Sequence, residues 1–438
     1  MKSRVVIVGS GFAGVEAAKA LSRSNFEIVL VDRNPYHTFI PMLYQVATAV
    51  LPPEQVVYPQ HQMYEKRDAV RYLQAEVAGI NFNQKMVQTT EGLNLDYQYL
   101  ILATGSQSQY LGVSGAAEYA FPMRTLVDAM ILRNHLFSCL EQATRQSDPE
   151  ERQRLLRFVI VGGGPTGIEL AGSLIQLLRG AVKRDFPDLN LAETQVILVQ
   201  SGDQLFKSYP EHLGHYTARW LRQQGIQVHL NAKVSRVTPS TVHLDGQRAD
   251  ETAIPTQTVI WTAGVEGAVP QMEQLLETTK RQQILVKPTL QVLNQNEVYA
   301  VGDLAQIEGQ SMGGVAQEAI QQGQAAAQNI LRQSEGKPLE PFEYNNKGKL
   351  AIIGRHAGVG EIGRFAFGGV LAWLLWLEVH WWYLPGIRNR LGVLGNWLKY
   401  YFSGQGLSSR AVSKPSEFLS STQKQKSEQL KVSQNRET

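Results

Sequence analysis

Cysteine is almost absent from this chain, which contains only Cys139 among its 438 residues. One thiol cannot form an internal disulfide or a CxxC redox pair. No cluster of cysteine and histidine has the spacing of a zinc site either. The sequence therefore favours a reducing compartment, and it predicts no metal site.

An excess of one charge is also missing. The 42 basic and 39 acidic residues give a formal net charge of +3, which makes no overall case for nucleic-acid binding. The apolar stretch that starts at Val5 runs directly into a glycine motif without a cleavage site, so it predicts a strand and not a signal peptide. With the single thiol, these absences favour a protein in the cytoplasm or on a membrane that faces it.

One motif occurs twice in this glycine-rich chain. Val5–Leu21 (VVIVGSGFAGVEAAKAL) and Phe158–Leu174 (FVIVGGGPTGIELAGSL) each combine an apolar strand, a GxGxxG turn and an amphipathic helix. The first glycine permits the tight turn, the second lets the backbone approach a pyrophosphate, and the third lets the helix pack on the strand. The sequence therefore predicts an α/β fold with two Rossmann-type dinucleotide-binding domains. The motif glycines are Gly9, Gly11, Gly14, Gly162, Gly164 and Gly167.

The first motif leads into a second apolar segment, EIVLVD, which ends at Asp32. A carboxylate at this distance from the glycine turn accepts hydrogen bonds from the hydroxyl groups of an adenosine ribose. We expect Asp32, and Arg33 beside it, to contact a dinucleotide.

Two later apolar segments, Tyr99–Ser106 (YLILATGS) and Val298–Ala305 (VYAVGDLA), end in small or acidic residues, and WTAG at 261–264 lies between them. This order resembles the two-dinucleotide-binding-domain flavoproteins, in which such strands return the chain to the flavin. The resemblance implies FAD in the first domain, with Asp303 holding the ribitol, and NADH or NADPH in a second, inserted domain. The other expected cofactor contacts on these segments are Thr104, Gly105, Gly302 and Gly264.

This organisation predicts four regions. An FAD-binding domain comprises residues 1–154 and 278–345, and an NAD(P)H-binding domain comprises 155–277. A C-terminal membrane-association region covers 346–402, and residues 403–438, rich in Ser, Gln and Lys, are expected to be disordered.

The residues most closely resemble the type II NAD(P)H:quinone oxidoreductases, single-chain dehydrogenases that do not pump protons. The resemblance implies non-covalent FAD, an electron donor that is NADH or NADPH, and a quinone acceptor of the plastoquinone, ubiquinone or menaquinone type. Related flavoproteins that relay electrons through a cysteine pair do not fit, because Cys139 is alone. The matching segments are 31–48 (VDRNPYHTFIPMLYQVAT), 162–172 (GGGPTGIELAG), the pair Gly302–Asp303, 315–323 (VAQEAIQQG), and AWLLW to LPGIRNRLGVLGNWL within 372–398.

The resemblance also assigns roles to single residues. In that family the glutamate of the second glycine helix, here Glu169, lies by the nicotinamide and the isoalloxazine. The AQ segment, here Ala316 and Gln317, lines the quinone site. We therefore name Glu169 and Gln317 as candidate catalytic residues. The competing interpretation of Glu169 is a charge favoured by the helix dipole, since Glu16 occupies the equivalent position in the first repeat.

Two further polar residues have alternative interpretations. Gln317 also fits an ordinary polar position in a glutamine-rich helix. His37, in PYHTF, is interpreted as a structural loop histidine beside the FAD and not as an acid or base, because hydride transfer needs alignment more than a protein base.

Gln200 ends the segment ILVQ, where most NADH-selective relatives carry an acid. A carboxylate there would repel the 2′-phosphate of NADPH by roughly 4 kcal/mol at about 4 Å and an effective dielectric of about 20. An amide lacks this repulsion and still binds ribose hydroxyls with about 0.5–1.5 kcal/mol. Gln200 therefore predicts relaxed choice between NADH and NADPH, with Lys207 as a nearby cation. The alternative is a neutral substitution compensated by Asp203.

The C-terminal region contains 20 mostly apolar residues, Phe365–Leu384. Glu378 and His380 lie inside this stretch, a glycine pair interrupts its start, and a charge at mid-bilayer costs about 2.5 kcal/mol or more. We therefore expect a helix that ends at Pro385–Gly386 and does not span a membrane.

After Pro385–Gly386 the pattern predicts a basic amphipathic helix over 387–402 that lies among lipid headgroups, with a tryptophan at the boundary. The alternative is a helix packed on the second domain or on a twin subunit, and a homodimer would combine both. The apolar positions are Ile387, Leu391, Leu394, Trp397, Leu398 and Tyr401, and the basic ones are Arg388, Arg390 and Lys399.

The sequence as a whole predicts an FAD-dependent NAD(P)H:quinone oxidoreductase, homodimeric and peripheral to the cytoplasmic face of a plasma or internal membrane. One alternative is a reductase of a small carrier protein such as a ferredoxin or rubredoxin, which would not need the amphipathic segment. Another is a flavin-based redox sensor.

Overall fold

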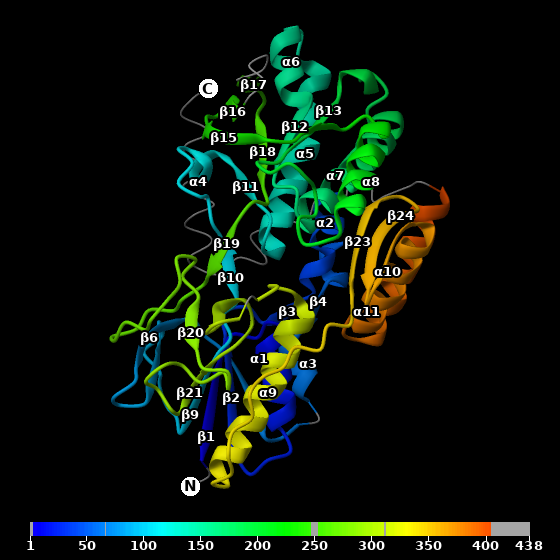
Figure 1. Ribbon diagram of the computed structural model, residues 1–438. Helices are drawn as coiled ribbons and strands as arrows, with labels where there is room; N and C mark the ends of the chain where they lie inside the picture. Colours follow the sequence, from blue (N-terminus) through cyan, green and yellow to red (C-terminus); the bar gives the residue numbers. More distant parts are fainter. Residues whose placement is uncertain (1–2, 66, 247–252, 311, 404–438) are drawn as a thin grey trace. The chain divides into compact units, whose positions relative to one another are not determined.

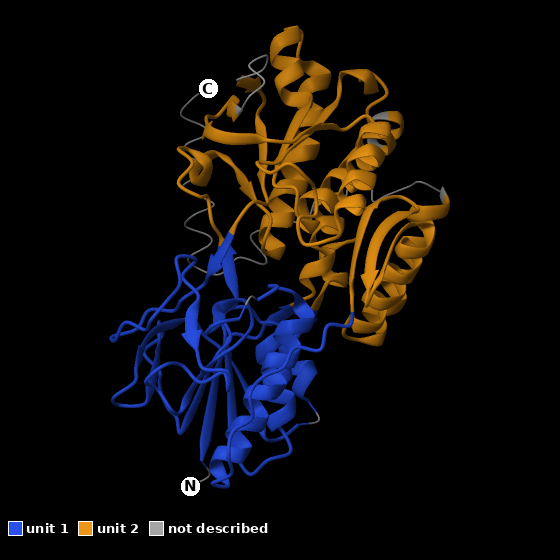
Figure 2. Cartoon of the chain, in the orientation of Figure 1, with its two compact units in different colours: residues 1–37, 58–107, 265–347 blue, residues 38–57, 108–264, 348–438 orange. Residues whose placement is uncertain are grey.

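The computed structural model describes residues 3–65, 67–246, 253–310 and 312–403, which form two compact units. Unit 1 comprises residues 1–37, 58–107 and 265–347, and unit 2 comprises residues 38–57, 108–264 and 348–438 (Figure 2). Of the tail expected to be disordered, residues 404–438 lie outside the described residues. The domain boundaries predicted from the sequence remain a prediction.

Unit 1 is built on a five-stranded parallel sheet with the order β21-β9-β1-β2-β5. Its inner strands are buried along nearly their whole length, as is typical of a parallel sheet covered on both faces. The glycine turn joins β1 to α1, as the first motif predicts. The strands are β1 (Arg4–Val8), β2 (Glu27–Asp32), β5 (Val70–Gln74), β9 (Tyr99–Leu102) and β21 (Val298–Ala300).

Helices α1 (Phe12–Leu21) and α9 (Ala316–Ser334), far apart in the sequence, lie side by side in this unit (Figure 1). A Cβ atom on Gly323 would lie 2.2 Å from the carbonyl oxygen of Ala13, so only glycine permits this close approach. The remaining elements are α3 (Gln60–Tyr64), β6 (Val77–Asn81), β7 (Met86–Thr89), β8 (Asn94–Asp96), β20 (Ile284–Val286), η4 (Gly302–Leu304) and β22 (Ala305–Ile307).

Unit 2 contains a second five-stranded parallel sheet, with the order β11-β18-β12-β13-β14. Its central strand leads through the second glycine turn into α7 (Pro165–Asp185). The two Rossmann-type sheets confirm the predicted α/β fold class. The strands are β11 (Phe121–Pro122), β12 (Arg157–Val161), β13 (Gln195–Val199), β14 (Gln227–His229) and β18 (Thr258–Trp261).

Helices and short strands complete the Rossmann-type part of unit 2. The longer helices are α5 (Leu126–Arg145), α6 (Pro149–Leu156) and α8 (Glu211–Gln223), and the antiparallel strands are β15 (Ala232–Val237), β16 (Thr241–Gly246) and β17 (Ala253–Pro255). The short helices are η1 (Ile40–Met42), α2 (Leu43–Ala47), η2 (Pro53–Gln55), α4 (Ala116–Tyr119) and η3 (Leu191–Glu193). Short strands where the chain passes between units are β3 (Tyr36–Thr38), β4 (Val57–Pro59), β10 (Ser106–Ser108) and β19 (Val265–Gly267).

The C-terminal segment of unit 2 forms a small antiparallel sheet followed by helices. It packs closely on the Rossmann-type part of the same unit, since a Cβ on Gly172 in α7 would lie 2.0 Å from the carbonyl oxygen of Ile353. The elements are β23 (Lys349–Gly354), β24 (Ala357–Ile362), β25 (Phe365–Gly369), α10 (Val370–Tyr383), α11 (Ile387–Leu398) and η5 (Lys399–Ser403).

Two details of this segment correct the sequence analysis. The apolar stretch is not one helix, because Phe365–Gly369 pairs with β24 and α10 begins only after Gly369, whose φ is +88°. Trp397 is not at a membrane boundary: it is 4% exposed, and its Nε1 donates to Gln45 Oε1 at 2.7 Å within unit 2. Tyr401 is buried as well.

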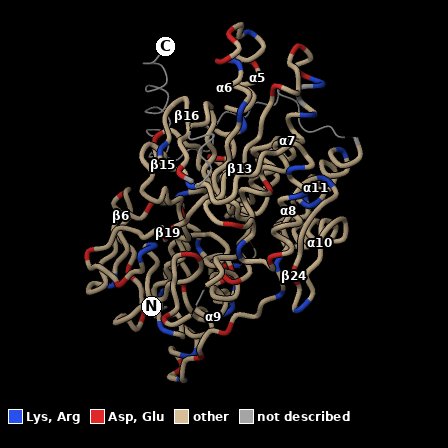
Figure 3. Tube along the Cα trace, turned by 45° about the horizontal axis from the view of Figure 1, so that its top comes forward, with Lys and Arg blue, Asp and Glu red and all other residues tan. Residues whose placement is uncertain are grey.

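The other predicted apolar positions of α11 are exposed, with Ile387 at 67% and Leu391 at 60%. Among the described residues, no helix has both the length and the apolar character needed to cross a bilayer. Charges of both signs are interspersed along the chain (Figure 3).

Candidate active site

The first glycine turn, between β1 and α1, has two packed glycines and one open one. Gly9 has a φ of +101°, and a Cβ on it would lie 2.4 Å from the carbonyl oxygen of Ala103. A Cβ on Gly14 would lie 1.9 Å from the carbonyl oxygen of Gly9, whereas Gly11 has no atom within 4 Å of its Cβ position. Gly11 is also the N-cap of α1, without a capping side chain. The positive end of the helix dipole therefore faces open space, which suits a pyrophosphate.

The second glycine turn repeats this arrangement in unit 2. Gly162 has a φ of +118°, and a Cβ on Gly167 would lie 2.0 Å from the carbonyl oxygen of Gly162. Gly164, like Gly11, has no atom within 4 Å of its Cβ position. Each unit therefore carries its own backbone cradle of the kind that binds a dinucleotide phosphate.

Asp32, which ends β2, and Gln200, which directly follows β13, hold these turns in place. Asp32 Oδ2 accepts from the backbone N of Ser10 at 2.7 Å, and Gln200 Oε1 accepts from the backbone N of Gly163 at 2.9 Å. Asp32 Oδ1 also accepts from the backbone N of Asn34 at 2.8 Å. The sequence predicts ribose recognition by both residues, whereas their hydrogen bonds to the turns appear only in the folded chain.

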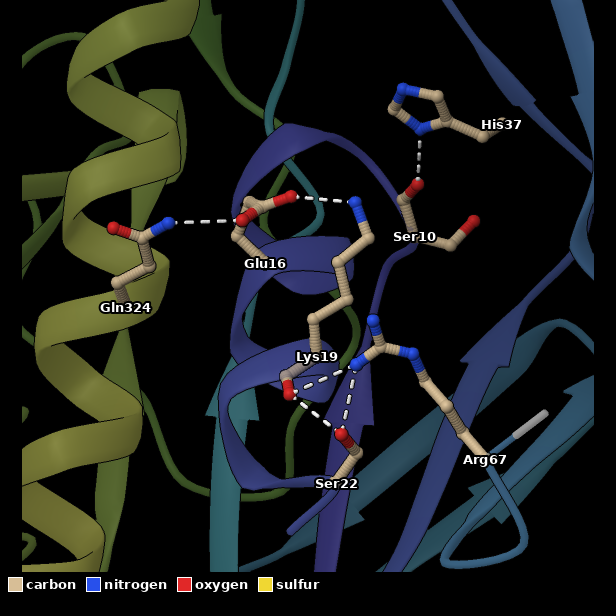
Figure 4. A network of polar contacts seen from close by, with 7 residues as sticks. All are labelled: Ser10, Glu16, Lys19, Ser22, His37, Arg67 and Gln324. Atoms are coloured by element: carbon tan, nitrogen blue, oxygen red, sulfur yellow. Dashed lines mark hydrogen bonds and ion pairs between the residues drawn. The ribbon is translucent and has the colours of Figure 1, made fainter. Parts of the chain in front are cut away.

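Ser10, between the first two motif glycines, is fixed by four hydrogen bonds. Besides its backbone bond to Asp32, its hydroxyl donates to Asp32 Oδ2 at 2.8 Å and accepts from Gln60 Nε2 at 2.6 Å. Its carbonyl oxygen lies 2.9 Å from His37 Nδ1 (Figure 4). Burial lowers the pKa of His37, so a neutral ring donates from Nδ1. Gln60 carries no motif signal, and only the fold shows its contact.

Glu16 and Glu169 occupy equivalent positions in the two repeats, yet their surroundings differ. Glu16 on α1 pairs with Lys19 at 2.7 Å and accepts from Gln324 Nε2 at 2.9 Å (Figure 4). Glu169, the fifth residue of α7, is 8% exposed, and its Oε1 accepts from the backbone N of Ile352 at 3.3 Å.

Burial raises the pKa of Glu169 to about 8, against hydrogen bonds from Ile352 and Trp376 that lower it. At neutral pH this carboxyl group therefore carries a proton in most molecules. Perturbed, buried carboxyl groups of this kind are concentrated at functional sites.

The carboxyl ends of β9 and β21 are neighbours in the sheet of unit 1, and this brings the predicted flavin contacts together. Asp303 Oδ2 accepts from the Ser106 hydroxyl at 2.8 Å. Thr104 Oγ1 donates to the carbonyl oxygen of Ala268 at 2.6 Å, and Gly105 adopts a φ of +72°. The backbone N of Gly302 donates to Gln322 Oε1 at 2.6 Å, which links this end of the sheet to α9.

The remaining predicted site residues are distributed as follows. Ala316 and Gln317 are the first two residues of α9 in unit 1. Arg33 is exposed and lies 3.8 Å from Glu76 as an ion pair in the same unit. Gly264 has a φ of +77° in unit 2, and its carbonyl oxygen accepts from the backbone N of Gln109 at 3.2 Å.

Cys139, the single thiol, is not part of the candidate active site. Cys139 is buried on α5, 3.4 Å from His135 Nε2, and burial raises its pKa to about 12. Thiols of such high pKa are poor nucleophiles. Within the described ranges, no three His, Cys, Asp or Glu side chains are placed to share a metal ion.

Comparison with known proteins agrees with this geometry. Residues 3–328 match the family described as pyridine nucleotide-disulphide oxidoreductase, and residues 346–405 match the NDH2 C-terminal domain. Type II NADH:quinone oxidoreductase Ndh of Mycobacterium tuberculosis is 34% identical, over 92% of this chain and 89% of that protein. Type II NADH:quinone oxidoreductase of Staphylococcus aureus is 28% identical, over 82% of this chain and 90% of that protein. The fold is that of NDH2 from Plasmodium falciparum, solved with NADH, with a TM-score of 0.83 at 19% identity over 92% of this chain and 99% of that one.

Proposed function

This chain belongs to the type II NADH:quinone oxidoreductases, and we propose that it transfers electrons from NADH to a quinone with FAD as its resident cofactor. FAD, when bound, accepts a hydride and passes two electrons on, without proton pumping. The protein supplies binding, orientation and electrostatics.

The residues of unit 1 fit FAD. The open Gly11 and the uncapped start of α1 suit the pyrophosphate, and Asp32 at the end of β2 suits the adenosine ribose. Thr104, Gly105, Gly302 and Asp303 gather at the carboxyl ends of the adjoining strands, where an open α/β sheet binds its ligand.

The residues of unit 2 fit NADH, and one observation carries the proposal. The second glycine turn leaves Gly164 open, and α7, which begins at Pro165, carries the buried Glu169 near its start, where burial raises the pKa of the carboxyl group to about 8. A neutral carboxyl group beside the nicotinamide can donate a hydrogen bond and does not add a charge. The quinone is proposed to contact Ala316 and Gln317.

The test is the visible spectrum of the purified protein, which should show a flavin that NADH bleaches and a quinone restores. A protein that binds no FAD, or whose flavin NADH does not reduce, would overturn the proposal.

We further propose that NADPH is also a donor. Gln200 places no negative charge at the end of β13, and its Oε1 already accepts a hydrogen bond from the backbone N of Gly163. The Nε2 group of the amide remains as a donor, and we propose that it faces the ribose of the cofactor. A donor binds a ribose hydroxyl or a 2′-phosphate, so neither cofactor is excluded.

Membrane association is proposed to involve residues 387–402, principally α11. Its exposed apolar side chains and its basic residues suit an interfacial helix, and a lipid-borne quinone would be reached from the membrane surface. A carrier-protein reductase would not need such a surface. Attachment to the cytoplasmic face and a homodimeric state belong to the same proposal. The exposed apolar side chains of α11 are Ile387, Leu391, Leu394 and Leu398.

A further inference from the structure

The start of α9 is held by a side chain to which no role has been assigned. The N-cap residue, Val315, has no capping side chain. Instead, Oε2 of Glu318, on the first turn of the helix, accepts from the backbone N of Gly313 at 2.9 Å and of Gly314 at 3.0 Å. One carboxylate oxygen thus fixes the two residues by which the chain approaches Ala316 and Gln317.

This contact places a carboxyl group in an unfavourable environment. Glu318 is 5% exposed. Burial raises its pKa, Asp303 raises it further, and the two glycine N–H groups and that of Val315 lower it. Tyr344 is the other titratable group that interacts with it. A buried anion beside a second carboxylate is costly, so the loop is held at the expense of stability.

The same helix is linked to the flavin end of unit 1 through Gln322, whose Oε1 accepts from the backbone N of Gly302. Gln322 lies one turn beyond Glu318, so successive turns of α9 hold the Gly302–Asp303 segment and the Gly313–Gly314 loop. Both segments flank the first turn of the helix, where Gln317 lies.

We propose that Glu318 is a positioning residue for the quinone: its two hydrogen bonds to Gly313 and Gly314 fix the loop and first turn that present Ala316 and Gln317. The inference rests on the proposed function, in which Ala316 and Gln317 contact the quinone. The two hydrogen bonds do not depend on that proposed function. The experiment therefore measures the hydrogen bonds and quinone reduction separately.

The test compares Glu318→Ala with Glu318→Gln in the full-length, FAD-loaded protein. Glu335→Ala is the matched control, because Glu335 lies at the C-cap of the same helix, where it pairs with Lys337 at 2.6 Å, away from the loop. Amide hydrogen exchange follows the loop, and rapid mixing follows flavin reduction by NADH and reoxidation by a short-chain ubiquinone separately.

The expected result is a split between the two half-reactions. Glu318→Ala should speed exchange at the Gly313 and Gly314 amides and raise the KM for the quinone about tenfold, with flavin reduction by NADH unchanged. Glu318→Gln, whose amide oxygen still accepts both N–H groups, should shift the quinone KM by about threefold or less. Glu335→Ala should match the wild type.

Several outcomes would overturn the inference. One is unchanged exchange at the two glycines, and another is faster exchange without any change in quinone KM. A third is an equal loss in both half-reactions, which would mark a purely structural role. If Glu318→Ala does not retain FAD, the Gln variant decides: a rise in quinone KM of about tenfold without faster exchange at the two glycines would show that the charge of Glu318, and not its hydrogen bonds, acts on the quinone, and would overturn the inference. A wild type that reduces no quinone would instead contradict the proposed function.

Discussion

Gln200 and Gly163 are joined by a hydrogen bond from a backbone N–H group to a side-chain oxygen, and Asp32 and Ser10 are joined in the same way in the other Rossmann-type sheet. The acceptor Asp32 ends β2, and the acceptor Gln200 directly follows β13. In both units the donor is the residue after the first motif glycine. An amide and a carboxylate thus perform the same structural task. The two sites differ in charge, and that difference bears on the choice of nicotinamide cofactor.

Gln200→Glu should shift that choice towards NADH. The new carboxylate keeps an acceptor for Gly163, gains two ribose hydroxyls and repels a 2′-phosphate, so the ratio of kcat/KM for NADH over NADPH should rise at least about tenfold, or about 1.4 kcal/mol. Steady-state kinetics with both cofactors measure this ratio. Gln204→Glu, the same substitution in the following loop, is the control. A wild type that already rejects NADPH would contradict the prediction.

Asp32→Ala should weaken the retention of FAD. The substitution removes the acceptor for the backbone N–H groups of Ser10 and Asn34, and each unsatisfied group costs about 1–3 kcal/mol. Fluorescence titration of the apoprotein with FAD should show at least about a tenfold loss of affinity. Equal affinity in the variant and the wild type would remove Asp32 from the FAD site. Glu27→Ala, at the other end of the same strand, is the control.

His37→Phe should weaken FAD binding by a different route. The ring of His37 hydrogen-bonds the carbonyl oxygen of Ser10, so its loss loosens the glycine turn. A neutral hydrogen bond contributes about 0.5–1.5 kcal/mol, which corresponds to a loss of affinity of up to about tenfold in the same titration. His37→Asn, which can donate from its amide, should recover part of the affinity. An Asn variant no better than the Phe variant would argue against the hydrogen bond.

Glu169→Gln should change how stability depends on pH. The pKa of this carboxyl group is raised from 4.5 to about 8 in the folded state. Its contribution to stability is therefore fully present below about pH 4.5 and is lost as the pH rises to about 8. The Gln variant cannot ionise, so its melting temperature relative to the wild type should increase from about pH 5 to about pH 8. Parallel melting curves for the two proteins across this range would contradict the raised pKa.

The glycine motifs predict much of the fold and of the site because their constraints are local. Gly9 and Gly162 need a positive φ, and Gly14 and Gly167 leave no room for a Cβ, so the turns can be recognised within a few residues. The apolar runs that follow the glycine helices likewise locate Asp32 and Gln200 at their ends.

Contacts between distant segments could not be predicted in this way. The backbone N of Ile352 reaches Glu169 across 183 positions, and Gln45 binds Trp397 across 352. Helical spacing placed Trp397 with the exposed apolar residues of α11, because periodicity identifies a face and not the partner that covers it. The strand at Phe365–Gly369 exists only because β24 lies beside it, so its composition alone favoured a helix.

Leu391→Ser combined with Ile387→Ser should release the protein from lipid vesicles. Both side chains are exposed on α11, and burying each in a membrane contributes about 1.5–3 kcal/mol. Co-sedimentation with vesicles should fall at least about tenfold, while flavin reduction by NADH continues. Trp397→Phe, which alters a buried side chain of the same helix, should stay bound. A double variant that still sediments with lipid would place the membrane contact elsewhere.

The central claim is that this chain carries electrons from NADH to a quinone through a bound flavin, and a single anaerobic spectroscopic titration tests it most directly. The protein as purified should show flavin absorbance, lose it on addition of one equivalent of NADH, and regain it on addition of one equivalent of a short-chain ubiquinone. A flavin that NADH reduces but that the quinone leaves reduced would contradict quinone reduction. A spectrum without flavin, from a folded protein that does not take up added FAD, would contradict the account as a whole.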